Sequence, residues 1–166
     1  MIQKNPETIV ETCQFVVVVD TREQAPWRFT GHPLPIVETI TDRALKTGDY
    51  SIAGLEHRFA IERKSVNDFY HSIGSDRERF EREMVRLASM DFAAVVIEGD
   101  WMELTVDRPD TIRMNVKAAV NTVASWSIRY GVHFMPCPSR RFAEIWSFRL
   151  MEQFWKQVQK EGAERA

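Results

Sequence analysis

The sequence predicts an α/β protein in which helices flank a central mixed β-sheet on both faces. Two apolar runs, at residues 15–19 and 92–98, are typical of strands buried on both sides, since half-exposed strands alternate apolar and polar residues. Amphipathic segments with helix-capping residues separate the strands along the chain. The 166 residues suffice for one domain with a large core. We expect residues 1–160 to form it and residues 161–166 to be a frayed tail.

The first half of the chain carries signals for one helix and four strands. Asn5 followed by Pro6 is typical of a helix start, and we expect that helix to end near Cys13. The strands follow from β-branched and aromatic runs, and the last two are joined as a hairpin near Gly54. Their expected ranges are 15–19, 36–41, 50–54 and 58–62.

The second half carries signals for four helices and two strands. Ser65 marks the start of the first helix, and the capping box from Ser75 to Glu78 opens the second. Helical spacing from Val116 to Ser127, followed by Gly131, predicts the third. Ser139 caps the fourth, which is rich in aromatic residues. The two strands are expected at 92–98 and 132–135, the latter broken by Pro136-Cys137-Pro138.

Composition and charge exclude several classes of protein. Hydrophobic residues make up 44% and charged residues 28%, which excludes disordered and collagen-like chains. No apolar run approaches the ~20 residues that span a membrane, and no signal peptide is evident. Cys13 and Cys137 lack metal-ligand spacing, so we expect free thiols in a reducing compartment. The formal net charge of -2, taken alone, argues weakly against a nucleic-acid binder.

Charged side chains gather where the predicted strands end. Asp20 and Glu23 follow the first strand, Asp49 precedes the hairpin, and Glu62 and Lys64 close it. Neighbouring strands lie about 5 Å apart, so these carboxylates can converge, and they repel one another unless a cation lies between them. Oxygen ligands suit Mg²⁺ or Mn²⁺ rather than Zn²⁺. The pattern fits metal-assisted phosphodiester hydrolysis; solvated strand ends are the alternative.

Three motifs in order sharpen this interpretation. They are Val18-Val19-Asp20-Thr21-Arg22-Glu23, Gly48-Asp49-Tyr50 and Glu62-Arg63-Lys64-Ser65-Val66-Asn67-Asp68. Together they resemble the nuclease domain of the XPF family of structure-specific endonucleases. The resemblance implies a restriction-endonuclease-like fold. It also implies a Mg²⁺- or Mn²⁺-dependent enzyme that hydrolyses phosphodiester bonds in branched, flap or junction DNA during repair or recombination.

The resemblance further implies a source and a setting. Small free-standing versions of this nuclease domain are similar to proteins that some bacteria and their phages encode, so we expect such a source and a cytoplasmic protein. Larger family members carry a helix-hairpin-helix pair after the nuclease domain, and we find no such motif in this sequence. DNA selection is then expected to need this domain, a second copy of it or a partner protein.

Individual residues acquire roles from the same resemblance. Asp20, Asp49 and Glu62 correspond to the metal-binding carboxylates, and Glu23 is a further candidate ligand, direct or through water. Lys64 corresponds to the catalytic lysine of the family. A catalytically silent DNA-binding or scaffolding subunit with the same fold is the alternative function. The intact acids and lysine argue against it.

Three further motif positions have less specific roles. Arg22 and Arg63 correspond to arginines associated with activity in the family. Arg63 is equally well explained as a surface charge or as the partner of an acid on the adjacent helix. Asp68 corresponds to the last acid of the signature. Because Ser65 lies three residues before it, a helix-capping role for Asp68 is at least as well supported as metal contact.

The distribution of charge suggests where DNA would bind. Residues 115–166 hold eight basic and four acidic side chains, whereas the rest of the chain is net acidic. Arginine binds phosphate through two hydrogen bonds at once. We therefore expect backbone contacts from the arginines of the motifs and from the basic C-terminal third, with an ordinary solvated face as the alternative. The C-terminal candidates are Lys117, Arg129, Arg140 and Arg141.

The last predicted helix carries more aromatic residues than one surface helix needs. Trp146, Phe148, Phe154 and Trp155 all lie within it. Large apolar side chains at so many positions indicate a buried helix or, as the second interpretation, a subunit interface. The partners expected from the sequence are thus DNA and a second copy of the chain or another protein, with no membrane.

Overall fold

The computed structural model describes residues 12–106 and 112–165 and contains a six-stranded mixed sheet. The strands are β1 (Thr12–Val19), β2 (Ile36–Ile40), β3 (Tyr50–Ile52), β4 (Phe59–Ser65), β5 (Phe92–Glu98) and β6 (His133–Cys137), in the order β2-β1-β3-β4-β5-β6. Strand β3 is antiparallel to both of its neighbours, and the other pairs are parallel. The carboxyl ends of β1, β4 and β5 therefore lie at one edge of the sheet, together with the start of β3.

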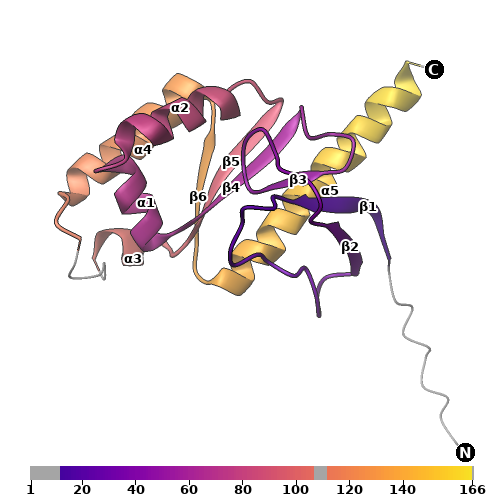
Figure 1. Cartoon of the computed structure of the whole chain (residues 1–166), viewed down its shortest axis with the longest axis horizontal. Coiled ribbons are helices and arrows are strands. Elements are labelled where there is room, and N and C mark those ends of the chain that lie inside the picture. The colour runs from indigo at the N-terminus through magenta and orange to yellow at the C-terminus, as the bar shows by residue number, and fades with distance from the viewer. Residues whose placement is uncertain (1–11, 107–111, 166) are drawn as a thin grey trace, which may run out of the picture.

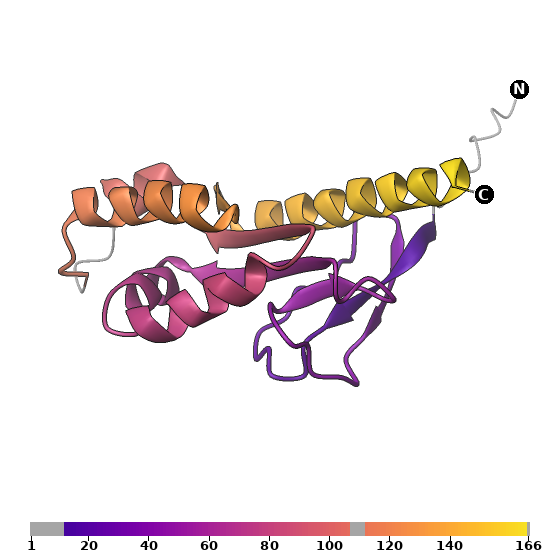
Figure 2. The ribbon, with the colours of Figure 1, turned by 90° about the horizontal axis from the view of Figure 1, so that it is seen from above.

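Helices cover both faces of this sheet, as predicted. They are α1 (Val66–Ile73), α2 (Arg77–Leu87), α3 (Trp101–Thr105), α4 (Val116–Tyr130) and α5 (Arg140–Glu164). Helices α1, α2 and α4 group at one end of the molecule, and α5 runs behind the strands (Figure 1). Figure 2 shows α5 as a long straight helix on the side opposite to α1 and α2. None of the helices in the described residues is long and apolar enough to cross a membrane.

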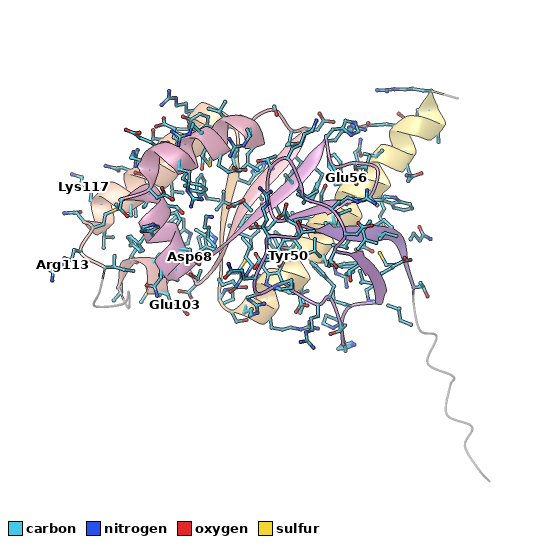
Figure 3. All side chains as sticks on the ribbon, viewed as in Figure 1. Tyr50, Glu56, Asp68, Glu103, Arg113 and Lys117 are labelled. Atoms are coloured by element: carbon cyan, nitrogen blue, oxygen red, sulfur yellow. The ribbon has the colours of Figure 1, made fainter. Side chains whose placement is uncertain are left out.

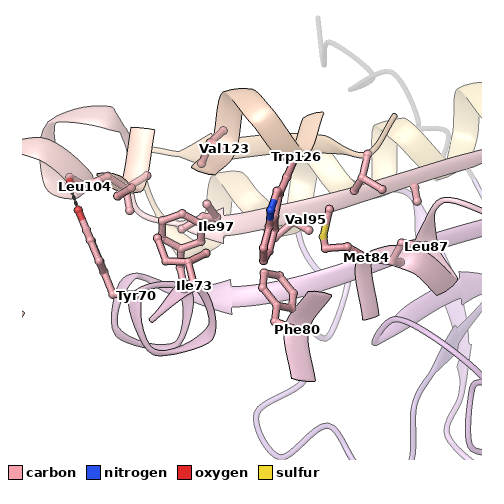
Figure 4. Close-up of a cluster of buried hydrophobic side chains, with 14 of the residues drawn as sticks. Tyr70, Ile73, Phe80, Met84, Leu87, Val95, Ile97, Leu104, Val123 and Trp126 are labelled. Atoms are coloured by element: carbon pink, nitrogen blue, oxygen red, sulfur yellow. Dashed lines mark hydrogen bonds between the residues drawn. The ribbon is translucent and has the colours of Figure 1, made fainter. Parts of the chain in front are cut away.

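The two faces of β5 bury two separate hydrophobic cores. Val95 and Ile97 pack with residues of α1, α2 and α4, whereas Val96 on the opposite face packs with residues of α5. Figure 4 shows the first core, where Trp126 lies against Phe80 with ring centroids 5.7 Å apart. The apolar run at 92–98 is thus a strand covered on both sides, which confirms the sequence interpretation.

Several helix ends form as the sequence predicts. The Ser65 hydroxyl accepts a hydrogen bond from the Asp68 amide at the start of α1, and the Ser139 hydroxyl does the same at the start of α5. Gly131 ends α4 in the left-handed region, with φ 67°. These residues satisfy backbone groups that a helix end leaves without an intrahelical partner.

Other element boundaries differ from the predictions. Thr12 and Cys13 belong to strand β1 rather than to the end of a helix, and the rest of that predicted helix lies outside the described residues. Pro136 does not break β6, which continues to Cys137. A proline is tolerated there because β6 is an edge strand, where an amide can lack a ladder partner.

Helix boundaries also depart from the predictions. The capping box at 75–78 is wrong, since the Ser75 hydroxyl contacts His71 Nδ1 and Asp76 makes no side-chain cap. Helix α3, capped by Asp100, is not predicted from the sequence. Helix α5 continues to Glu164 and so includes residues assigned to the frayed tail.

The aromatic residues of α5 divide between the core and the surface. Phe148 is buried, with 1% exposed, which confirms part of the prediction. Trp146 is 40% exposed and stacks on Phe142, which is 45% exposed, with ring centroids 6.3 Å apart. The expectation of a fully buried helix is therefore wrong for this stretch.

Candidate active site

The predicted site residues come together at one edge of the sheet. Asp20 follows β1, Asp49 precedes β3, and Glu62 and Lys64 lie in the carboxyl half of β4. Backbone hydrogen bonds join these strand ends, from the Asp20 amide to the Asp49 carbonyl at 2.8 Å and from the Asp49 amide to the Ile61 carbonyl at 2.7 Å. All eight motif residues line one open cleft of about 650 Å³; the others are Arg22, Glu23, Arg63 and Asp68.

Asp49 owes its position to the glycine before it. Gly48 has φ +75°, and a Cβ there would lie 3.0 Å from the Ile61 carbonyl oxygen, so the chain can pass this close to β4 only with glycine. The Asp49 carboxylate accepts one hydrogen bond, from the Arg63 amide at 2.7 Å. Burial, and then the charge of Glu62, raise the pKa of Asp49 to about 8.

Glu62 and Lys64 form a close ion pair on the cleft side of β4. They are two residues apart, so their side chains point to the same face of the strand, and Lys64 Nζ lies 2.5 Å from Glu62 Oε1. Burial raises the pKa of Glu62, although Lys64 opposes the shift. For Lys64, burial favours the neutral amine, but the Glu62 carboxylate outweighs it and raises the pKa. The lysine is therefore a charged hydrogen-bond donor at neutral pH.

Asp20 has a different environment from the other two acids. Its carboxylate accepts four hydrogen bonds, from the Arg22 amide, Nε and Nη2 and from the Leu45 amide, at 2.6–2.8 Å. The Arg22 guanidinium holds the pKa of Asp20 below its usual value, against the effect of burial. Asp20 is 3% exposed. This geometry favours a positioning role for Asp20, and its assignment as a metal ligand stays a prediction.

Arg63 points away from Glu62, toward Glu98, an acid that sequence reasoning missed. Arg63 is not an exposed surface charge, and Glu98 lies on strand β5 rather than on the adjacent helix. Glu98 accepts hydrogen bonds from Arg63 Nε and Nη2, both at 2.8 Å, and from Trp27 Nε1 at 2.7 Å. Arg63 Nη1 also lies 3.2 Å from Glu23 Oε1. Arg63 thus links two acids, and its amide holds Asp49. The sequence signal that could have identified Glu98 is its position at the end of the apolar strand at 92–98. In the parallel register of β4 and β5, Glu98 pairs with Ser65 and so lies at the same strand ends as the other acids.

Asp68 lies in the first turn of α1 and contacts Ser65, which caps that helix. The Ser65 hydroxyl donates to Asp68 Oδ2 at 2.6 Å while accepting from the Asp68 amide at 3.1 Å. The side chain still borders the cleft. Its interactions with Ser65 account for its position, and metal contact stays a prediction.

The expected metal cluster of Asp20, Glu23, Asp49 and Glu62 stays a prediction, although all four acids line the cleft. Within residues 12–106 and 112–165, no three His, Cys, Asp or Glu side chains are arranged to hold one metal ion. Asp49 and Glu62 are the two acids among the described cleft residues whose pKa values are raised, in both cases chiefly by burial. Two carboxylates fit Mg²⁺, which keeps several waters and uses one or two protein carboxylates together with substrate phosphates.

Comparison with known proteins identifies the family. The profile of the ERCC4 domain matches residues 19–148. The chain belongs to the ERCC4 domain family. Two solved structures of XPF from Aeropyrum pernix are similar to it. The first has TM-score 0.61 and 22% identity over 89% of this chain and 63% of that one, and the second, a complex with DNA, has TM-score 0.63 and 20% identity over 87% and 66%.

These likenesses confirm the restriction-endonuclease-like fold expected from the sequence. The chain spans slightly less than two thirds of the length of the two XPF chains. Among curated protein sequences, none matches it.

The C-terminal cations predicted to contact DNA lie outside the cleft of this ERCC4 domain. Arg140 binds Glu98 and the carbonyls of the loop after Glu23, and Arg141 binds Glu144 and the carbonyls of Gly31 and His32. These two arginines therefore hold the loop over 24–35 to α5. Arg129 pairs with Glu81. In Figure 3, Lys117 lies at the end of the molecule away from Tyr50, the residue that follows Asp49.

Proposed function

We propose that this ERCC4 domain is a divalent-metal-dependent DNA endonuclease that hydrolyses phosphodiester bonds in branched or flap DNA during repair or recombination. The observation that carries the proposal is the meeting of Asp49, Glu62 and Lys64 in one open cleft, each from a complete motif. The similar XPF structure in complex with DNA supports DNA as the substrate.

Asp49 and Glu62 are the residues that would hold Mg²⁺ or Mn²⁺. Burial raises the pKa values of both acids, and Lys64 places only one positive charge beside them, so a divalent cation would favour the charged form of both carboxylates. When bound, such a cation polarises a phosphate and lowers the pKa of an attacking water. Glu23 is the third candidate, although Arg63 already binds one of its oxygens.

The surrounding residues orient these groups. The Arg63 amide fixes the rotation of the Asp49 carboxylate, and the backbone bonds of Asp49 tie it to β1 and β4. Lys64, protonated and 14% exposed, supplies a hydrogen-bond donor that orients the attacking water or offsets negative charge developing on the phosphate. Such a preorganised donor contributes most in a site that excludes bulk water.

A cleavage assay tests the proposal. Labelled flap, splayed-arm, four-way and plain duplex DNAs are incubated with the protein in Mg²⁺, Mn²⁺ or EDTA, and Lys64→Ala is compared with Lys160→Ala, a lysine on α5 outside the cleft. We expect metal-dependent cutting of branched DNA that is lost only in Lys64→Ala. Binding without cutting in every metal would contradict the enzyme and support the silent DNA-binding subunit. Equal cutting of duplex and branched DNA would contradict the substrate preference.

The second copy expected from the aromatic α5 is also part of the proposal. Phe142 and Trp146 form the exposed aromatic pair that could be covered by it. Light scattering at high protein concentration tests this directly. A dimer that Trp146→Ala dissociates supports the expectation, and a strict monomer contradicts it.

A further inference from the structure

The basic side chains of the cleft are unequally neutralised. Six line it in the described part of the chain, and four of them pair with acids that line the same cleft. The pairs are Arg22–Asp20, Arg63–Glu23, Lys64–Glu62 and Arg86–Glu83. In the described part of the chain, no acid that lines the cleft forms an ion pair with the remaining two cations, Lys46 and Arg79.

Lys46 and Arg79 reach the cleft from different elements. Lys46 is exposed on the loop between β2 and β3, three residues before Asp49, and makes no ion pair with any residue that the structure describes. Arg79 is on α2, and its side chain is 72% exposed. Its partner, Asp76, does not line the cleft.

The loop that carries Lys46 is held on both sides of it. Leu45 and Thr47 are buried, with 5% and 4% exposed. The Leu45 amide donates to Asp20, and the Thr47 hydroxyl donates to Glu83 on α2. Asp20 and Glu83 thus hold the backbone on either side of Lys46, and this backbone places Lys46 at the cleft.

Helix α2 gives Arg79 an equally firm base. Phe80, Met84 and Leu87 are buried in the core between α2 and the sheet, so the helix cannot shift without disrupting that core. Arg79, Glu83 and Arg86 repeat at helical spacing and all line the cleft. The backbone that carries Arg79 is thus held in place on the cleft side of α2.

The chemistry of the cleft walls favours contact with a nucleic-acid backbone. None of the described residues that line it is aromatic, so the cleft offers no platform on which bases could stack. Cations and backbone amides bind phosphates, and phosphate contacts fix the position of DNA without reading its sequence.

We propose that Lys46 and Arg79 bind DNA phosphates that flank the bond to be cut and so hold the strand across the cleft independently of sequence. This rests on the proposed function, because it assumes that the cleft with Asp49 and Glu62 is the catalytic one. Lys46 and Arg79 are positioning residues in this scheme, since they contact the substrate away from the reacting atoms.

The experiment measures binding and cleavage separately. Fluorescence anisotropy in EDTA follows a labelled flap DNA binding to Lys46→Ala and Arg79→Ala over a series of salt concentrations. The matched controls are Lys160→Ala and Arg82→Ala, an exposed arginine on the same helix that does not line the cleft. Single-turnover cleavage in Mg²⁺ then gives the rate at saturating DNA and the DNA concentration needed for half of it.

We expect each cleft variant to bind about 3- to 10-fold more weakly and to lower the slope of log affinity against log salt by about 1, as the loss of one phosphate contact requires. The cleavage rate at saturating DNA is retained, and more DNA is needed to reach it. Both control variants behave as the wild type, and thermal melts of all four agree.

The outcomes distinguish the two proposals. If the wild type cuts DNA and the cleft variants bind with the affinity and salt slope of the controls, the phosphate-binding role is overturned and the nuclease stands. If no variant or wild type cuts under any metal, yet binding depends on Lys46 and Arg79, the nuclease fails and the phosphate contacts are supported.

Discussion

Glu98 offers the sharpest test of how the site is held together, through the substitution Glu98→Gln. Its carboxylate is 10% exposed and accepts from Arg63, Trp27 and Arg140. The glutamine keeps one oxygen as an acceptor, but its amide group turns N–H donors toward the Arg63 guanidinium. Arg63 is 14% exposed and then retains, among the residues that the structure describes, Glu23 as its one charged partner, at 3.2 Å.

The expected loss of stability follows from these contacts. A hydrogen bond to a charged group contributes about 1.5–3 kcal/mol, and removing one partner of a buried ion pair costs about 3–5 kcal/mol. Because the amide oxygen preserves part of the bonding, we expect Glu98→Gln to lower the free energy of unfolding by about 3 kcal/mol. At about 2–4 °C per kcal/mol for a domain of this size, Tm falls by about 6–12 °C.

Urea denaturation and thermal melts measure this loss, with Asp91→Asn as the control. That variant removes an ion pair with Arg58 in which Asp91 is 52% exposed, so its cost should not exceed about 1 kcal/mol. If Glu98→Gln costs no more than Asp91→Asn, the reasoning that a buried acid holds Arg63 at the site is refuted.

Three further predictions concern the strand ends. Gly48→Ala should lower Tm more than Gly54→Ala. A Cβ at Gly48 would lie 3.0 Å from a β4 carbonyl oxygen, whereas a Cβ at Gly54 would meet nothing within 4 Å. Equal decreases in Tm by calorimetry would contradict the close approach of Gly48 to β4. Because the pKa of Asp49 is raised from 3.8 to about 8, the folded chain binds a proton that the unfolded chain releases, so metal-free protein should lose stability as pH rises between these values. Urea titrations in chelator should show that loss and a smaller one in Asp49→Asn, which keeps the raised pKa of Glu62, and a flat wild-type profile would count against the raised pKa of Asp49. The adjacent guanidinium lowers the pKa of Asp20, so the stability that Asp20 contributes is present above the unfolded pKa of 3.8 and is lost as pH falls through the folded pKa. Acid titrations should find that Asp20→Asn loses less stability than the wild type as pH falls, and identical losses in the two proteins would exclude that contribution.

Local sequence signals predicted much of the fold because they act within a few residues. The run at 92–98 is apolar on both faces because helices cover both sides of β5. Ser65 and Ser139 begin helices, and Gly131 ends one, by contacts with nearby backbone. Pro136 was misjudged because its tolerance depends on β6 lying at the sheet edge, a property of the whole topology.

The candidate site was predictable in its members and less so in their contacts. The motifs named Asp49, Glu62 and Lys64, and the structure brings them to one cleft. Neither the saturation of Asp20 by four hydrogen bonds nor the pairing of Arg63 with Glu98 could be read from spacing. Both depend on side-chain directions across strands and loops that are distant in the sequence.

The cations near the site show the same limit. Net charge along the chain pointed to the C-terminal third, yet Arg140 and Arg141 hold a loop there, whereas Lys46 and Arg79 border the cleft from net-acidic segments. Regional charge therefore does not show which cations border the cleft, because the fold brings cations from different segments together.

Single-turnover cleavage of one labelled flap DNA by wild type and Glu62→Gln in Mg²⁺, with Asp91→Asn as the control, tests the central claim most directly. The proposed site predicts that wild type and Asp91→Asn cut at similar rates and that EDTA abolishes cutting. The cleavage rate of Glu62→Gln should be lower by more than about a hundredfold, the loss expected when a group that stabilises transition-state charge is removed. This variant should still bind the DNA. Cutting by Glu62→Gln at the wild-type rate would contradict the claim that this cleft performs the reaction.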